Sequence, residues 1–323
     1  MSNIKDVAKM AAVSAITVSR VINFPHKVRP ETRKRVEEAM RETKYVPNRA
    51  AKNLVAGQTG IIDVYIPENV ALSNPFMMFF ITGISEALGE KMYSFLIKRS
   101  WNVEHNCDGY IVTGLLTDEI NDFYAYAKER GRPVALFGHT DIEEVDCLDV
   151  DNVLGASMAV SHLIENGHTS IGMINVAEKK DYTMDRYRGY RLAMKNAGLP
   201  PGRTIRAANS FNGGYRAVQK LLSGGPLSAV FCASDVLAIG AINGMADAGL
   251  RVPKDISVIG YDGMGHHLLT DPHITTIVQP VIEIGRALAM TLTARISGET
   301  NRTFKLIPPR LYREGKTVAA PAG

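Results

Sequence analysis

The chain has 323 residues, 46% of them apolar, so it is long enough for two or three domains with buried cores. It contains no run of eighteen apolar residues and no secretory signal, which argues against a membrane span and predicts a cytoplasmic protein without a membrane partner. Its three cysteines have no metal-ligand spacing, so we expect reduced thiols, no metal site and no cofactor.

The charge is unevenly distributed along the chain. The net charge is +4, but residues 1–56 carry twelve basic against five acidic side chains, a balance of +7, and the remainder therefore carries −3. A basic head on a slightly acidic body indicates a nucleic-acid reader joined to a part that senses another signal.

The stretch IKDVAKMAAVSAITVSRVIN, from Ile4 to Asn23, has apolar residues at helical spacing in two groups. The break between them falls at residues 12–14. Asn3 and Ser14 stand where N-cap side chains would accept hydrogen bonds from the first turns. The sequence therefore predicts two short helices with a tight joint.

The second of these helices has an unusual outer face. Ile16 and Arg20 lie four residues apart and project side by side, flanked by Ala15, Thr17 and Ser19. In a major groove, Arg can pair with guanine and an apolar side chain can contact a thymine methyl group. The alternative is a small helical hairpin that packs on a larger domain.

A third helix is predicted from Pro30 to about Thr43. Thr32 and Arg33, with the amides of its first turn, could hold a DNA phosphate. The alternative is that these basic residues form only a solvated face.

The next helical piece, Asn48 to Val55, is too short to be stable alone and should order only on a partner. Its twin from a second subunit, inside a minor groove, would be such a partner. Leu54 would then wedge between base steps, with Ala51 and Asn48 against the groove wall. We expect a helix-turn-helix DNA-binding domain at residues 1–45, a hinge helix and linker at 46–59, and an effector-binding and dimerisation domain at 60–323.

From Ile61 onward, short apolar runs alternate with amphipathic segments, which predicts parallel doubly wound sheets with ligands outside the carboxyl ends of the strands. The expected strands are 60–67, 93–98, 109–114, 133–138, 147–151, 170–175, 228–234, 256–262 and 274–280, and the expected helices are 76–90, 118–130, 155–166, 185–197, 215–222, 236–248 and 282–297.

Polar and aromatic residues gather at the expected strand ends and in nearby loops. Carboxylates, amides, an Arg and aromatic rings together can hydrogen-bond hydroxyl groups and stack on a sugar ring. The candidate effector-binding residues are Ser73, Asn74, Phe76, Asp151, Arg186, Phe211, Ser234, Asp262 and Gln279. Simpler roles are open for several of them: a helix cap for Asp151, a core ring for Phe76, an ion pair for Arg186 and a turn for Asp262.

The head matches the pattern IKDVA…VS…TVSRV…N…TR…Y.PN..A..L and resembles the LacI/GalR family of bacterial transcriptional regulators, with Ala12 in place of the usual turn glycine. The resemblance continues through the body. It implies a small all-α helix-turn-helix head and an α/β body of two doubly wound parallel-sheet subdomains of the periplasmic-binding-protein type. It also implies that Ala15, Ile16 and Arg20 read bases. The predicted DNA-binding set is Asn3, Ser14, Ala15, Ile16, Thr17, Ser19, Arg20, Asn23, Thr32, Arg33, Tyr45, Asn48, Ala51 and Leu54.

The sequence departs from the family in the segment Arg99 to Asp108, where the family usually has a full helix. Ten residues are short for a parallel crossover, so we expect a loop or a single turn there, with an exposed edge near Trp101. The loop around Phe211 is also shorter than usual, and Ser234 stands where several members have Asn.

The leading hypothesis is a homodimeric repressor of carbohydrate-utilisation genes that binds a palindromic DNA operator and is switched by a small-molecule effector, a sugar or sugar derivative. A regulator co-repressed by a purine or another metabolite and a solute-binding protein without DNA function are the alternatives. No phosphate loop or catalytic triad is recognisable, so we expect no enzyme. We expect the adjacent His266 and His267 to lie in a surface loop.

Overall fold

The computed structural model describes residues 2–45, 57–101, 105–178 and 180–321. The chain divides into two compact units, residues 1–61 with 105–108, and residues 62–104 with 109–323. Within the described residues, no helix is both long enough and apolar enough to cross a membrane.

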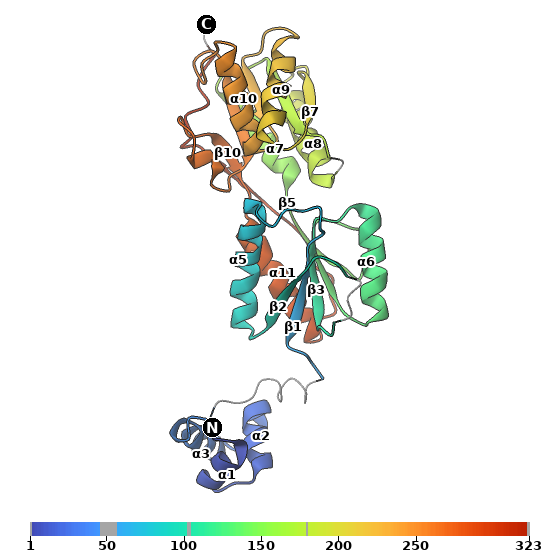
Figure 1. Cartoon of the computed structure of the whole chain (residues 1–323), viewed down its shortest axis with the longest axis vertical. Helices are drawn as coiled ribbons and strands as arrows, with labels where there is room; N and C mark the ends of the chain where they lie inside the picture. Colours follow the sequence, from blue (N-terminus) through green and yellow to red (C-terminus); the bar gives the residue numbers. More distant parts are fainter. Residues whose placement is uncertain (1, 46–56, 102–104, 179, 322–323) are drawn as a thin grey trace. The chain divides into compact units, whose positions relative to one another are not determined.

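The first unit contains a head of three helices, α1 (Ile4–Met10), α2 (Ala15–Asn23) and α3 (Pro30–Glu42), with a 3-10 turn η1 (Pro25–Lys27) between α2 and α3 (Figure 1). Val7, Val18 and Val36, one from each helix, are fully buried and form its core. Because so few apolar side chains hold the head together, its helix ends matter for its stability.

Both predicted N-caps are confirmed. The Asn3 side chain accepts from the amide of Asp6, whose carboxylate accepts from the Asn3 amide at 2.8 Å. Ser14 Oγ accepts from the Thr17 amide at 3.1 Å. These bonds fix where α1 and α2 begin and so fix the joint between them.

The joint passes through Ala12, whose φ is +51°. This left-handed conformation explains why the family usually has a glycine at this position, because an L residue with a Cβ is strained there. The backbone angle is therefore the main constraint on the residue at this position.

The body contains two six-stranded sheets. The first has the order β11-β5-β4-β3-β1-β2, and the strand pairings recorded from β11 through β1 are parallel. Helices α5 (Pro75–Glu90) and α11 (Val281–Ile296) pack together on one face, and α6 (Thr117–Glu129) lies on the other (Figure 1). The strands are β1 (Ile61–Tyr65), β2 (Ser94–Lys98), β3 (Gly109–Thr113), β4 (Val134–Phe137), β5 (Asp146–Val150) and β11 (Phe304–Ile307).

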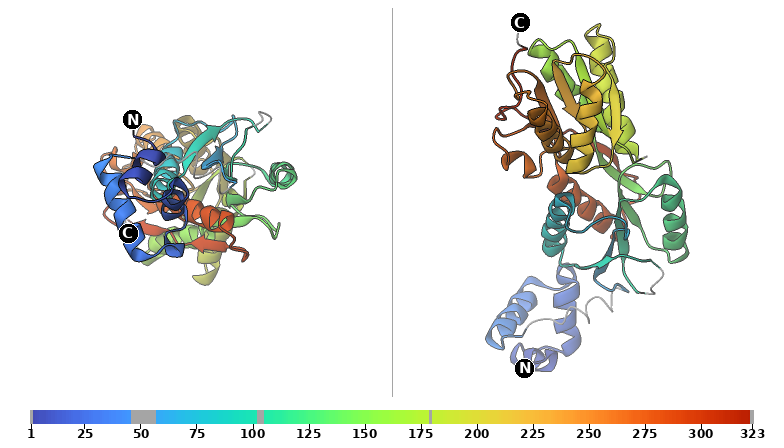
Figure 2. Two further views of the ribbon diagram at one scale, coloured as in Figure 1. Left: turned by 90° about the horizontal axis from the view of Figure 1, so that it is seen from below. Right: turned by 45° about the horizontal axis from the view of Figure 1, so that its top comes forward.

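The second sheet has the order β12-β10-β9-β8-β6-β7 and is parallel except for β12. Its central strands are buried on both faces beneath two helix pairs, α7 (Asn152–Glu165) with α8 (Asp181–Asn196) and α9 (Phe211–Leu222) with α10 (Asp235–Asp247) (Figure 2). The strands are β6 (Ile171–Val176), β7 (Thr204–Ala207), β8 (Ala229–Cys232), β9 (Ser257–Asp262), β10 (Thr275–Val278) and β12 (Arg310–Tyr312), and η2 (His266–Leu268) follows β9.

The doubly wound prediction is confirmed, with differences at element ends. Helices α7, α8 and α9 begin three or four residues earlier than expected. The side chains of Asp151 and Ser210 cap α7 and α9 at these earlier positions. The sequence reading missed the edge strands β7, β11 and β12, which are short and partly exposed.

The shortened crossover contains no helix in its described residues 99–101 and 105–108, as expected. Trp101 does not form an exposed edge, however. It is partly buried and stacks on Tyr65, with 5.6 Å between ring centroids, and also contacts Phe123 and Tyr126. These rings cover part of the sheet that a crossover helix would otherwise cover.

Two charged residues fix the ends of this crossover. Arg99 Nη2 donates to the carbonyl groups of Glu68 and Val70, both at 2.7 Å, in the segment that leads to α5. The buried carboxylate of Asp108 accepts from the amides of Thr59 and Gly60 at 2.8 and 2.7 Å. Charge-assisted bonds to backbone therefore hold both neighbouring segments.

We predict that Ala12→Gly stabilises the head by about 0.5–1 kcal/mol, because relief of the left-handed strain exceeds the entropy that glycine loses on folding. Amide hydrogen exchange of the head should slow accordingly. Ala11→Gly is the matched control: Ala11 is buried with φ −78°, so that change should accelerate exchange. Faster exchange in Ala12→Gly would contradict the strain argument.

Candidate functional site

The head exposes the face that the sequence singled out. The Ile16 side chain is 67% exposed and Arg20 is exposed beside it, whereas Val18 is fully buried. Ser14 Oγ and Thr17 Oγ1 are 2.9 Å apart at the start of the helix. An exposed Ile and Arg on the rigid face of a capped helix form a surface suited to base edges.

The other predicted DNA-binding residues of the head have mixed settings. Arg33 Nε donates to Glu37 at 3.0 Å, an exposed pair four residues apart, and Thr32 lies in the first turn of α3. Tyr45 packs against the head core, and Asn23 is the last residue of α2. Asn48, Ala51 and Leu54 lie outside the described residues.

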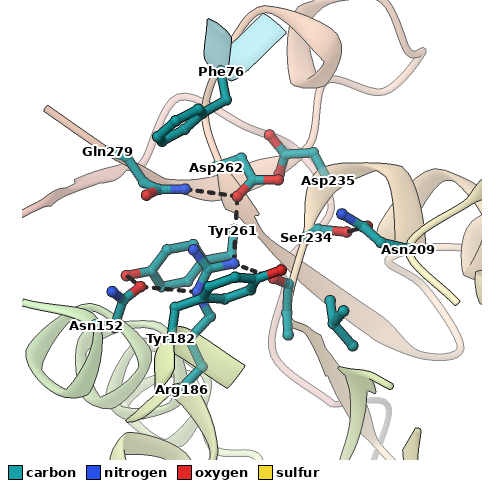
Figure 3. Close-up of polar contacts among 12 residues, drawn as sticks. Phe76, Asn152, Tyr182, Arg186, Asn209, Ser234, Asp235, Tyr261, Asp262 and Gln279 are labelled. Atoms are coloured by element: carbon teal, nitrogen blue, oxygen red, sulfur yellow. Dashed lines mark hydrogen bonds and ion pairs between the residues drawn. The ribbon is translucent and has the colours of Figure 1, made fainter. Parts of the chain in front are cut away.

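In the body, Arg186 on α8 is the centre of a polar cluster and is 5% exposed. Its Nε donates to Asn152 Oδ1 at 3.0 Å, and its Nη1 donates to the Ala233 carbonyl at 2.6 Å. The guanidinium lies 3.8 Å from the centroid of the Tyr261 ring and 4.9 Å from that of Tyr182 (Figure 3). Stacking and hydrogen bonding together leave this side chain one orientation.

Asp262 and Gln279 join this cluster from the ends of β9 and β10. Asp262 Oδ1 accepts from Gln279 Nε2 at 2.7 Å and from Arg186 Nη1 at 3.4 Å. The Asp262 side chain keeps 25% of its surface exposed. Figure 3 shows Phe76 on the same side of the cluster as Gln279. Three of the predicted residues thus form one connected group, to which an incoming ligand could bind.

The Arg186 guanidinium lies near two carboxyl groups, those of Asp262 and Asp149. Burial raises the pKa of Asp262, although the nearby Arg186 charge opposes the rise. Burial, with a smaller contribution from the charge of Asp185, raises the pKa of Asp149 at the end of β5 to about 7. The neighbourhood therefore disfavours additional negative charge.

Three of the other predicted residues cap helices. Asp151 accepts from the Leu154 amide at 2.8 Å and caps α7, and Asn74 caps α5 in the same way. Ser234 caps α10 and donates to Asn209 at 2.6 Å. Ser73 is exposed in a turn.

One of the two aromatic candidates, Phe211, differs from its predicted setting. Phe76 contacts Phe137 and Phe80, with ring centroids 5.0 and 6.0 Å apart, at the margin of the first core. Phe211 is not in a loop: it is the first residue of α9 and is 44% exposed. Ser210 follows a short polar loop and caps α9, so the helix begins earlier in the chain than its apolar pattern indicates.

Asn152, Tyr182 and Tyr261 contact Arg186 but are not among the candidate residues. Asn152 and Tyr261 directly adjoin the candidates Asp151 and Asp262 at expected strand ends, which was their signal in the sequence. Asn209 bonds to the candidate Ser234. The prediction of a surface loop was wrong for His267, which is buried against the Tyr312 ring.

Among the described residues, no group of three or more His, Cys, Asp or Glu side chains is placed to hold a metal ion. The three cysteines are free and buried.

The raised pKa of Asp149 makes the stability of the body depend on pH. Between its ordinary value of 3.8 and about 7, the folded carboxyl holds a proton that the unfolded chain releases, so stability falls as pH rises through this range. We predict that Asp149→Asn raises the free energy of unfolding by about 1–3 kcal/mol at pH 8 and changes it little at pH 4.5.

Thermal unfolding at the two pH values measures this effect. Asp151→Asn is the control, because Asn also caps a helix and the change should be small at both values. An equal effect of Asp149→Asn at pH 4.5 and pH 8 would count against a buried, protonated carboxyl.

Comparisons with known proteins agree with this architecture. Residues 3–48 match the model of the bacterial regulatory proteins, lacI family, and residues 160–317 match that of the periplasmic binding protein-like domain. The chain is 35% identical to the uncharacterized HTH-type transcriptional regulator YvdE of Bacillus subtilis (strain 168), over 97% of this chain and 99% of that protein. It is 32% identical to the ribose operon repressor of Escherichia coli (strain K12), over 98% and 99%.

Solved structures extend the likeness to both units. The complex of the transcriptional regulator CelR with cellobiose aligns with a TM-score of 0.74 at 30% identity, over 98% of this chain and all of that one. The lac repressor dimer bound to operator and the anti-inducer ONPF aligns with a TM-score of 0.75 at 26% identity, over 98% and 99%. The chain therefore belongs to the lacI family of bacterial regulatory proteins.

Proposed function

We propose that this protein is a transcriptional repressor of carbohydrate-utilisation genes that binds a palindromic operator as a homodimer and is controlled by a sugar or sugar derivative. The observation that carries the proposal is that one chain combines the exposed Ile16–Arg20 face with the buried Arg186 cluster. In this assignment residues 1–45 bind DNA, residues 46–59 form the hinge and linker, and residues 60–323 sense the effector and dimerise.

The DNA-binding part of the proposal rests on the outer face of α2. Ala15, Ile16 and Arg20 would read bases, while Thr32, Arg33 and the basic balance of the first 56 residues would hold phosphates. Leu54 would wedge the minor groove beside its twin from the second subunit. The lac repressor dimer, bound to operator, supports this arrangement by its likeness to the present chain.

We predict that Arg20→Ala weakens binding to a duplex selected from random sequence by about 10- to 100-fold, because a bidentate base contact is lost. Arg41→Ala is the matched control: Arg41 is an exposed basic residue near the end of α3, so binding should weaken only a few-fold. Gel-shift titration at fixed salt measures both. Equal losses would remove Arg20 from the base-reading set.

The effector part rests on the Arg186 cluster. Arg186, Asp262 and Gln279 offer donors and acceptors at one place, and Phe76 offers a ring nearby (Figure 3). Such a set matches the hydroxyl groups and apolar faces of a sugar. CelR in complex with cellobiose and an Enterococcus faecium regulator with bound ribose are similar in structure and support a sugar.

The charge of the cluster favours an uncharged effector over a phosphorylated one. Arg186 is already paired with Asp262, and the charges that act on Asp149 include the carboxylates of Asp185 and Asp181. A phosphate group would meet this negative field without a free guanidinium to neutralise it.

We predict that a neutral sugar raises the Tm of the protein in a screen of cellobiose, ribose and glucose, and that ribose 5-phosphate and glucose 6-phosphate have smaller effects. A ligand at a hundred times its Kd stabilises by about 2.7 kcal/mol. Arg186→Lys keeps the positive charge but removes the planar set of guanidinium donors, so it should abolish the increase in Tm. Stabilisation by a phosphorylated sugar alone would contradict the neutral-effector proposal.

Effector binding should then change operator affinity by about ten- to a hundred-fold, the usual scale of such coupling. The same titrations distinguish the alternatives. A solute-binding protein would bind sugar but show no preference for any duplex, and an enzyme would convert the sugar during the incubation. A purine that stabilises the protein would favour the co-repressed regulator.

A further inference from the structure

Asp235, the first residue of α10, has a buried carboxylate that the proposed sensor mechanism does not use. It is 1% exposed. Its Oδ2 accepts from the Gly263 amide at 2.8 Å, and its Oδ1 accepts from Thr276 Oγ1 at 2.5 Å. The carboxylate therefore ties α10 to the end of β9 and to β10.

This tie is costly, because the carboxylate is buried close to a second carboxyl group. Burial, reinforced by the negative charge of Asp262, raises the pKa of Asp235, although the bonds from Thr276 and Gly263 and the charge of Arg186 oppose the rise. His267 Nδ1 lies 3.9 Å away, but burial lowers the pKa of His267, so at neutral pH the ring supplies no positive charge. A buried acid whose charged form is destabilised in this way indicates a function that compensates for the lost stability.

The backbone next to the tie is strained. Asp262 has a φ of +125°, which an L residue other than glycine rarely adopts and which needs surrounding support. Gly263, which follows with a φ of +64°, packs so closely that a Cβ would lie 2.6 Å from Val278. The amide that Asp235 accepts from is thus the one directly after the strained residue.

The sheet is also shaped to admit the carboxylate. A Cβ on Gly260 would lie 2.3 Å from Asp235 Oδ1, so only a glycine at this point of β9 leaves room for it. Gly260 pairs with Thr276 across β9 and β10, which places the Thr276 hydroxyl beside the same oxygen. Gly260, Gly263 and Thr276 together form a fitted site for the Asp235 side chain.

We propose that Asp235 is a positioning residue for the effector site: its carboxylate holds the backbone at Asp262 and Gly263 in the conformation that turns the Asp262 side chain toward Arg186 and Gln279. The buried Asp235 carboxylate lies beside Asp262 and accepts from Gly263 and Thr276, whereas the Asp235 backbone amide hydrogen-bonds the Asp262 carboxyl (Figure 3). The inference rests on the proposed function of the Arg186 cluster as an effector site.

The proposal distinguishes an acceptor at residue 235 from a charge there. In Asp235→Asn the amide oxygen still accepts from the Gly263 N–H, and the NH2 group faces the Thr276 hydroxyl as a donor. In Asp235→Ala both partners lose their bond. Asp247→Ala is the matched control, because Asp247 is an exposed acid on the same helix that bonds only to the Tyr215 hydroxyl in the described contacts.

The first experiment determines crystal structures of the full chain with Asp235→Ala, Asp235→Asn and Asp247→Ala, without sugar. Only in Asp235→Ala do we expect Asp262 to leave the positive-φ region and its carboxylate to lose the bond from Gln279. Unchanged Asp262 geometry in that variant would overturn the proposal. Should Asp235→Ala fail to fold, Thr276→Val, which removes one of the two bonds at nearly constant shape, takes its place: a displaced Asp262 carboxylate supports the proposal, and an unmoved one overturns it.

The second experiment titrates the same variants with cellobiose or ribose, whichever raises the Tm of the unmodified protein. We expect sugar affinity about 10- to 100-fold weaker in Asp235→Ala and within about threefold in Asp235→Asn and Asp247→Ala. Rescue by Asn would show that residue 235 supplies an acceptor for the Gly263 amide and not a negative charge. Equal affinity in all three variants would overturn the proposal. If neither sugar binds the unmodified protein, the sugar proposal fails, while the crystal structures still test Asp235.

Discussion

The guanidinium of Arg186 is the contact on which the sensor depends. It joins the start of α7 through Asn152, the end of β8 through the Ala233 carbonyl and the end of β9 through Asp262. Each of these groups is a buried or half-buried polar atom that would lose one hydrogen bond without Arg186. Because Tyr261 and Tyr182 also flank the planar group, the fold and the ligand site share one side chain, and neither can change without the other.

The head depends on a different kind of interaction. Its three helices share a small core, so the side-chain caps at Asn3 and Ser14 and the left-handed residue Ala12 determine where each helix begins and how sharply the chain turns. These are local interactions along the chain. They place Ile16 and Arg20 on an exposed face while Val18 is buried behind them.

Local rules explain why much of the molecule could be predicted. The caps, the alternation of apolar strands and helices, and the strand ends that carry Asp262 and Gln279 all follow from short-range pattern. The exceptions depend on contacts between distant residues. Asn152 and Tyr261 are 109 residues apart in the sequence, and the hydrogen bond between their side chains forms only in the folded chain. Short edge strands such as β7 and β11 have too little periodicity to be recognised. Phe211 was misplaced because a helix cap, and not an apolar repeat, begins α9.

The stack of rings that covers the shortened crossover has a practical consequence. Trp101 is the single tryptophan of the chain, and it lies against Tyr65 and Phe123 on the first sheet of the body. All indole emission from the protein therefore originates at one known position. Arg99, two residues away, is bonded to the segment that leads into α5 and Phe76. Intrinsic fluorescence thus offers a label-free optical reporter whose single source lies in the sensor body.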